Sequence, residues 1–128
     1  MLNGIEYDEN CVALSFQGQI TSQEILDANT QIINHPDFAS FQYQLWICQP
    51  VEDFLLSTND IQELADQDRK AAEINPSIKV AVVSDSPLVF GFGRMYEAFS
   101  QDSPWEIMIF YRLKEAKEWL GLEEPSKK

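Results

Sequence analysis

The sequence predicts a single α/β domain built on a five-stranded, mostly parallel sheet. Short β-branched apolar runs alternate along the chain with segments of helical periodicity, and two alternating apolar segments with only a short turn between them open it. Strands that alternate with helices favour a parallel sheet covered by helices, and the opening hairpin adds one antiparallel strand. The expected order is β-β-α-β-α-β-α-β-α over residues 1–122, with residues 123–128 as a flexible tail.

Capping signals place the starts of the first two helices. Thr21 and Glu24 have the spacing of a capping box, which predicts a helix start at this point. Ser57 and Asp60 repeat that spacing further along. Strands are expected at residues 1–8, 11–17, 42–48, 78–83 and 105–110, residues 18–20 are a predicted connector, residues 49–56 are a predicted loop, and Gly121 is the expected cap of the last helix.

Composition excludes two classes of partner. The 128 residues include 21 acidic and 9 basic side chains, for a formal net charge of −12. Nucleic acids and anionic membranes are bound through clusters of Lys and Arg, so neither is an expected partner. No signal peptide or apolar run of about 18 residues is present, so stable membrane insertion is not expected. Cys11 and Cys48 lie far apart in apolar segments, as expected for reduced core residues of a cytoplasmic protein.

A third helix is predicted from Pro87, with Ser86 as its N-cap. At about 100° per residue, Phe90 points away from the apolar stripe and lies near Arg94. This outward ring is interpreted either as a local stack on the arginine or as an anchor in a partner surface. The stripe expected to face the core consists of Leu88, Phe92, Met95 and Phe99.

Two glycines interrupt this helix. Gly91 and Gly93 each cost about 1 kcal/mol of helix propensity relative to alanine, so a packing or functional reason is expected. They either allow a neighbouring element to pack closely or leave room for a ligand, and the packing interpretation is favoured. Just before the helix, Ser84 and Ser86 follow a predicted parallel strand, where ligands of α/β sheets bind. The intervening Asp85 disfavours an anion, and ordinary helix-start chemistry is the favoured explanation.

Catalysis and metal binding find little support in the sequence. His35 is the only histidine and lies in a proline turn, where a structural role is expected. The sequence contains no serine-hydrolase elbow, phosphate-binding loop or zinc-protease motif. No catalytic residue, metal or cofactor is therefore expected. Asp68 falls on the apolar stripe of the second helix, so it is expected either to pair with a basic group or to lie at an exposed end.

Several short segments over nearly the whole chain carry a family resemblance. Besides the opening hairpin, they are residues 18–21 (GQIT), 35–38 (HPDF), 56–58 (LST), 90–97 (FGFGRMYE) and 116–121 (AKEWLG). In these segments the chain resembles the bacterial SpoIIAA-like (STAS-like) proteins, which have been compared with lipid-binding CRAL-TRIO domains. The resemblance implies a STAS-type fold and a non-catalytic interaction or regulatory module, with a protein partner or a second copy of the chain as its contact.

The resemblance also implies a phosphorylation candidate. In STAS antagonists a phosphorylatable serine follows the third strand at the start of a helix, and Ser57, with Thr58 beside it, takes that position here. Leu56 stands where the family has an acid, and the family's glycines are absent. Helix capping is therefore the favoured role of Ser57.

The comparison with CRAL-TRIO domains supplies an alternative function. It implies a binder of a small apolar ligand or lipid, lined by the turn at residues 91–93 and by the apolar loop that begins at Phe54. Under either function, the predicted contact residues are Phe54, Ser84, Ser86, Phe90, Gly91, Gly93 and Arg94.

Overall fold

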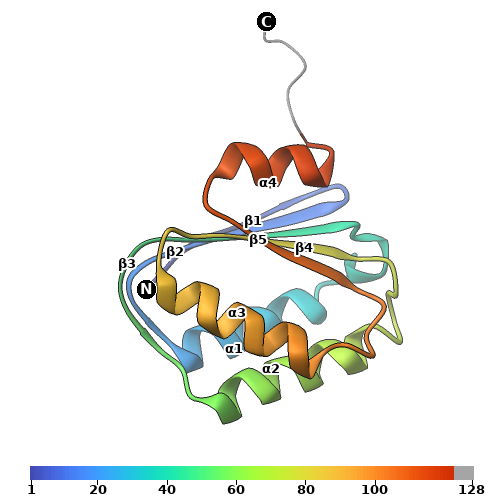
Figure 1. Cartoon of the computed structure of the whole chain (residues 1–128). Helices are drawn as coiled ribbons and strands as arrows, with labels where there is room; N and C mark the ends of the chain where they lie inside the picture. The colour runs from blue at the N-terminus through green and yellow to red at the C-terminus, as the bar shows by residue number, and fades with distance from the viewer. Residues whose placement is uncertain (123–128) are drawn as a thin grey trace, which may run out of the picture.

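A five-stranded sheet runs through the middle of the molecule, with helices on both of its faces (Figure 1). The structure is a computed structural model that describes residues 1–122, so the tail predicted at residues 123–128 lies outside the described residues. The strands lie side by side in chain order: β1 (Leu2–Asp8), β2 (Cys11–Thr21), β3 (Tyr43–Leu55), β4 (Lys79–Val83) and β5 (Glu106–Phe110). Only β1 is antiparallel to its neighbour, which confirms the predicted class and element order.

The helices divide unequally between the two faces. The first three, α1 (Ser22–Ile33), α2 (Thr58–Ala71) and α3 (Pro87–Phe99), cover one face, and α4 (Leu113–Leu120) covers the other (Figure 1). A short 3₁₀ turn, η1 (Phe38–Ser40), precedes β3. Because side chains alternate along a strand, each parallel strand contributes side chains to both faces of the sheet. The larger core lies under α1–α3, and a smaller one, built on Leu45, Ala81, Val83, Ala116 and Leu120, lies under α4.

The caps predicted for α1, α2 and α4 are present. The Glu24 backbone N–H donates to the Thr21 hydroxyl at 3.3 Å, and the Thr21 N–H donates back to the Glu24 carboxylate at 3.2 Å. Ser57 and Asp60 form the same reciprocal pair at 3.2 and 2.8 Å. Gly121 closes α4 with a left-handed φ of 77°, where glycine has no Cβ penalty. These signals depend only on residues three apart or fewer, so the sequence alone was sufficient to locate them.

The connector predicted at residues 18–20 and the loop predicted at residues 49–56 are wrong, because β2 and β3 continue as a pair. Their ladder extends to Thr21 opposite Leu55, with irregular register around Gly18. Gly18 has a φ of 72°, a left-handed conformation that glycine readily adopts. Pro50 lies within the irregular stretch, where a missing N–H costs least.

Three of the four residues predicted for the core stripe of α3, Phe92, Met95 and Phe99, pack partly buried against the larger core, but the stripe is rotated toward Val89 and Tyr96. Leu88 is 47% exposed, whereas Val89 and Tyr96 are buried. A Cβ built on Gly93 would collide with the end of the Ile109 side chain of β5 and would lie 3.1 Å from its Cγ1. The helix therefore packs on the sheet through Val89, Gly93 and Tyr96, and the bare Gly93 backbone permits the approach. Of the two readings of this glycine, close packing is the one the geometry bears out.

The two glycines of α3 give a matched pair of substitutions. Gly91 faces open space, so Gly91→Ala is expected to stabilise the fold by about 0.5–1 kcal/mol through helix propensity. Gly93→Ala forces Ile109 out of its place and is expected to destabilise by about 1 kcal/mol, a cost that the additional change Ile109→Val relieves by removing the obstructing methyl group. Urea titrations measure the free energy of unfolding of all three variants. Equal changes in this free energy for the two glycine substitutions would contradict the packing role of Gly93.

Phe90 lies outside both apolar cores, as predicted, but its stacking partner is Tyr111 and not Arg94. Phe90 is half-buried, and its ring stacks on Tyr111, with 4.5 Å between centroids. Arg94 is exposed. The reason is the segment between β5 and α4, which brings Tyr111 beside the start of α3, a contact between residues too distant in sequence for helical spacing to reveal.

Candidate functional site

A cavity of about 80 Å³ lies between the sheet and helices α1–α3. Strands β3, β4 and β5 form one wall, and the three helices form the other. Most of the lining is apolar, including Trp46, Val80 and Ile107 from the strands and Ile25, Ile61 and Val89 from the helices. A single buried water needs roughly 10–15 Å³, so this space is large enough for a small organic molecule.

Several residues predicted from sequence lie in this lining. Phe54, Leu56 and Gly93 all border the cavity, and the Phe54 ring packs on Phe92 with 5.5 Å between centroids. Gly91 does not border it and is exposed. The two stretches singled out as a ligand lining, one at the end of β3 and one in α3, therefore meet at the same space.

One end of the cavity is polar and is organised around Asp68. This carboxylate is only 5% exposed. The Asn29 side-chain amide donates to its Oδ1 at 2.9 Å, and the Tyr96 hydroxyl donates to its Oδ2. Among the described residues no cation pairs with Asp68. Both alternatives expected for Asp68 are therefore wrong: it is buried, and neutral donors from α1 and α3 replace the basic partner.

Burial has a direct effect on the protonation of this cluster. Desolvation raises the pKa of Asp68 to about 6, although the hydrogen bonds from Tyr96 and Asn29 act in the opposite direction. Burial, together with the neighbouring Asp68 charge, raises the pKa of Tyr96 well above its usual value. Tyr96 therefore stays a hydrogen-bond donor at neutral pH, and Asp68 titrates within the ordinary range of buffers.

Gln44, on β3, contributes an unpaired amide to the cavity wall. The side chain is 1% exposed, and the Trp46 indole N–H donates to its Oε1 at 2.9 Å. Because an indole nitrogen can only donate, the amide oxygen must face Trp46, which fixes the orientation of the whole amide group. The Nε2 group then has no hydrogen-bond partner among the described residues. Buried polar groups are rarely left in this state.

Gln44 is the residue that sequence reasoning missed. The signal was the alternation of the predicted strand at residues 42–48, in which Gln44 shares a face with Trp46 and Cys48. That face packs in the larger core, while Tyr43, Leu45 and Ile47 face α4. An uncharged polar residue on an apolar strand face indicates either an internal hydrogen bond or a binding role. Here the amide oxygen has the internal hydrogen bond, and Nε2 has no partner among the described residues.

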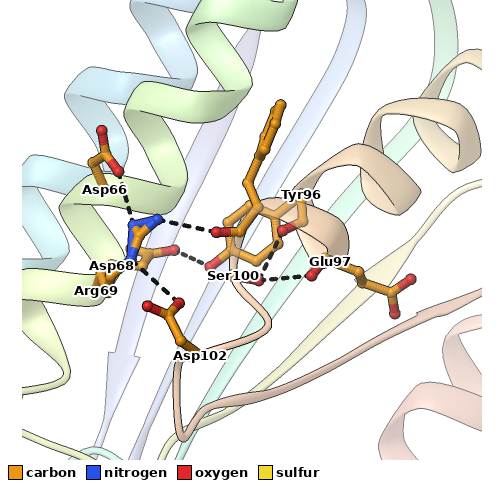
Figure 2. Close-up of polar contacts among 8 residues, drawn as sticks. Asp66, Asp68, Arg69, Tyr96, Glu97, Ser100 and Asp102 are labelled. Atoms are coloured by element: carbon orange, nitrogen blue, oxygen red, sulfur yellow. Dashed lines mark hydrogen bonds and ion pairs between the residues drawn. The ribbon is translucent and has the colours of Figure 1, made fainter.

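Arg69, which follows Asp68 on α2, makes polar contacts with neighbours on α2 and at the end of α3 (Figure 2). Its guanidinium pairs with Asp66 at 2.7 Å and Asp102 at 3.3 Å, and it donates to the Phe99 carbonyl at 3.0 Å. Ser100 caps the end of α3 by donating to the Tyr96 carbonyl at 2.7 Å. These contacts tie α2 to the end of α3, so the side chains of Asp68 and Tyr96 are held from both helices.

The other reactive groups lack a catalytic arrangement. Burial raises the pKa of the Cys48 thiol to about 12, so almost no thiolate forms at neutral pH. His35 does not border the cavity; its Nδ1 accepts from the Asp37 N–H at 3.0 Å, and its ring stacks on Tyr7. Within residues 1–122, no group of three His, Cys, Asp or Glu side chains is arranged to hold a metal ion.

The predicted serine sites are occupied by structural contacts. Ser57 and Thr58 are exposed, and the Ser57 hydroxyl caps α2; phosphorylation of either stays a prediction. Ser84 is fully buried, and its hydroxyl accepts from the Ser86 N–H at 3.1 Å. Ser86 occupies the N-cap position of α3 without a side-chain cap bond. Ser86 therefore stands at the predicted start of the helix, but the side-chain hydrogen bond at this point comes from Ser84 and not from Ser86.

Comparisons with known proteins support the fold. No protein-family model matches the chain, and no curated protein matches it in sequence. Among solved structures, it is similar to the anti-sigma factor antagonist SpoIIAA in its unphosphorylated form, with a TM-score of 0.64 and 10% identity over 97% of this chain and 100% of that one. It is also similar to an uncharacterised DUF3478-family protein with a SpoIIAA-like fold from Shewanella loihica PV-4, with a TM-score of 0.51 and 17% identity over 94% and 92% of the two chains. The chain therefore has a SpoIIAA-like fold.

Within the described residues, no helix is both long and apolar enough to cross a membrane.

Proposed function

We propose that this chain is a non-catalytic binding module that holds a small, mainly apolar molecule in the cavity under α1–α3. The observation that carries the proposal is the cavity itself, whose walls combine apolar side chains from three strands and three helices. Ligand sites in proteins have this composition, with mostly apolar walls and a few placed polar groups. The raised pKa of Cys48 and the structural use of His35 support the non-catalytic part of the proposal.

The volume indicates the size of the ligand. A cavity of about 150 Å³ holds benzene, so one of about 80 Å³ suits a small ring or short chain, with benzene as the upper limit of size. A long acyl chain does not fit in this conformation. Of the two ligand classes implied by the sequence resemblance, the small apolar molecule is therefore the better supported.

A regulatory role through contact with a second protein is the broader part of the same proposal. The SpoIIAA-like fold supports it, because one structure that shares the fold is an anti-sigma factor antagonist. Tyr111, which is 64% exposed and stacks on Phe90, and Leu88, which is 47% exposed, offer apolar surface for such a contact. We place the module in the cytoplasm, on the grounds that both cysteines are free and one of them is buried.

Binding in the cavity is testable with benzene as the probe. In methyl-labelled protein, benzene is expected to shift the methyl resonances of Val82 and Ile107, which line the cavity, and to leave those of Val51 unchanged. Val82→Phe fills the space and is expected to abolish the shifts. Val51→Phe introduces the same ring outside the lining and is expected to preserve them. A titration that moves no lining methyl group would contradict the proposal.

A further inference from the structure

We propose that the molecule held in this cavity carries an uncharged carbonyl oxygen, which accepts a hydrogen bond from Gln44 Nε2. This inference rests on the proposed function and names the chemical class of its ligand. Its starting point is the one fully buried side-chain nitrogen or oxygen of the lining that has no hydrogen-bond partner in the part of the chain that the structure describes.

The Gln44 amide is already oriented for this task. The bond from the Trp46 indole to Oε1 turns the –NH₂ group away from Trp46, and at 1% exposure bulk water cannot reach it. A buried donor without a partner costs free energy that an acceptor recovers on binding. The –NH₂ group can only donate hydrogen bonds, so it selects a carbonyl or similar acceptor on the ligand and cannot bond a ligand donor.

The rest of the polar end explains why the acceptor is uncharged. Asp68 borders the same cavity, so a ligand carboxylate would meet a like charge once Asp68 ionises. Within residues 1–122 no basic side chain lines the space, and the nearby Arg69 is engaged with Asp66, Asp102 and the Phe99 carbonyl. Asp68 itself already accepts from Asn29 and Tyr96, so a ligand hydroxyl finds its most obvious acceptor occupied.

Two isosteric probes separate this inference from the proposed function. Cyclopentanone carries the carbonyl oxygen, and methylenecyclopentane replaces that oxygen with a CH₂ group. Both are expected to shift the lining methyl groups of Val82 and Ile107. Only cyclopentanone is expected to move the side-chain amide protons of Gln44 downfield in ¹⁵N-labelled protein. This measurement uses the wild-type chain, so it does not depend on a variant that folds.

The variant Gln44→Met supplies the energetic test. It keeps the length of the side chain and removes the amide, so the preference for cyclopentanone over methylenecyclopentane is expected to fall by about threefold to tenfold. Butanoate, of similar size but anionic at pH 7.5, is expected to shift neither the Gln44 amide nor the lining methyl groups. If the two cyclic probes bind with no Gln44 amide shift, the carbonyl inference is overturned and the binding function stands. If neither probe moves the lining methyl groups, both fail.

Discussion

Replacing Asn75 with alanine is expected to lower the free energy of unfolding by about 3 kcal/mol. Asn75 is 4% exposed, and its Nδ2 donates to the carbonyls of Phe38 and Phe41 at 2.8 and 2.7 Å. Its Oδ1 accepts from the Ser77 N–H at 3.1 Å. Alanine leaves these groups buried without that partner, at about 1–3 kcal/mol for each group that finds no substitute. Urea titration measures the loss as a lower midpoint with an unchanged slope.

Two further variants sharpen this test. Asn75→Asp retains an acceptor for Ser77 and faces the two carbonyls with a carboxylate, so it is expected to be at least as destabilising at pH 7. Asn59→Ala changes the same residue type at an exposed position of α2 and is expected to alter stability by less than about 0.5 kcal/mol. An Asn75→Ala protein as stable as the Asn59→Ala protein would show that the buried bonds contribute little.

Asn75 also illustrates which parts of the fold were accessible from sequence. The Asn-Pro-Ser sequence at residues 75–77 is a local signal that predicts a break in the chain before β4. The two carbonyl partners of Asn75, and the Trp105 indole that donates to its own carbonyl at 2.7 Å, were not predicted. Phe38 and Phe41 lie in η1 and directly after it, and Trp105 directly precedes β5. Only the assembled sheet brings these segments next to Asn75.

The same distinction explains the strand ends and the rotation of α3. Whether β2 and β3 continue past Gly18 and Pro50 depends on each strand having the other as a partner, a property of the pair that neither segment displays alone. The face that α3 buries depends on the contact of Gly93 with Ile109 of a later strand. Helical periodicity identified an apolar helix correctly, but with apolar residues nearly all round it could not select the face.

For the candidate site, sequence located parts of the wall and missed its polar end. Phe54 and Gly93 stood out individually, as an apolar residue in an expected loop and a glycine in a helix. The hydrogen bonds that link Asp68 to Asn29 and Tyr96 form only when α1, α2 and α3 pack together on one face of the sheet. Asp68 was noticed as an anomaly on an apolar stripe, and the anomaly did mark a special position, with neutral donors in place of the expected cation.

Asp68 gives the second large effect, a pH dependence of stability that Asp68→Asn removes. Its pKa rises from 3.8 to about 6 on folding, so the folded state binds the extra proton between those values. The contribution of Asp68 to the free energy of unfolding is thus fully present below about pH 4 and is lost as the pH rises through about 6. A shift of this size corresponds to roughly 3 kcal/mol at 1.36 kcal/mol per unit.

The measurement is the difference in unfolding free energy between wild type and Asp68→Asn, from urea titrations at pH 3.5 and pH 7.5. Contributions from the other carboxylates are common to both proteins and cancel. Asparagine can accept from Asn29 and donate to the Tyr96 oxygen, so the variant keeps a bonded cluster without a charge. We expect the difference to move by about 3 kcal/mol in favour of the variant between the two pH values.

Asp66→Asn, an exposed change on the same helix, should show no comparable movement. A difference that stays constant would mean that folding does not raise the pKa of Asp68.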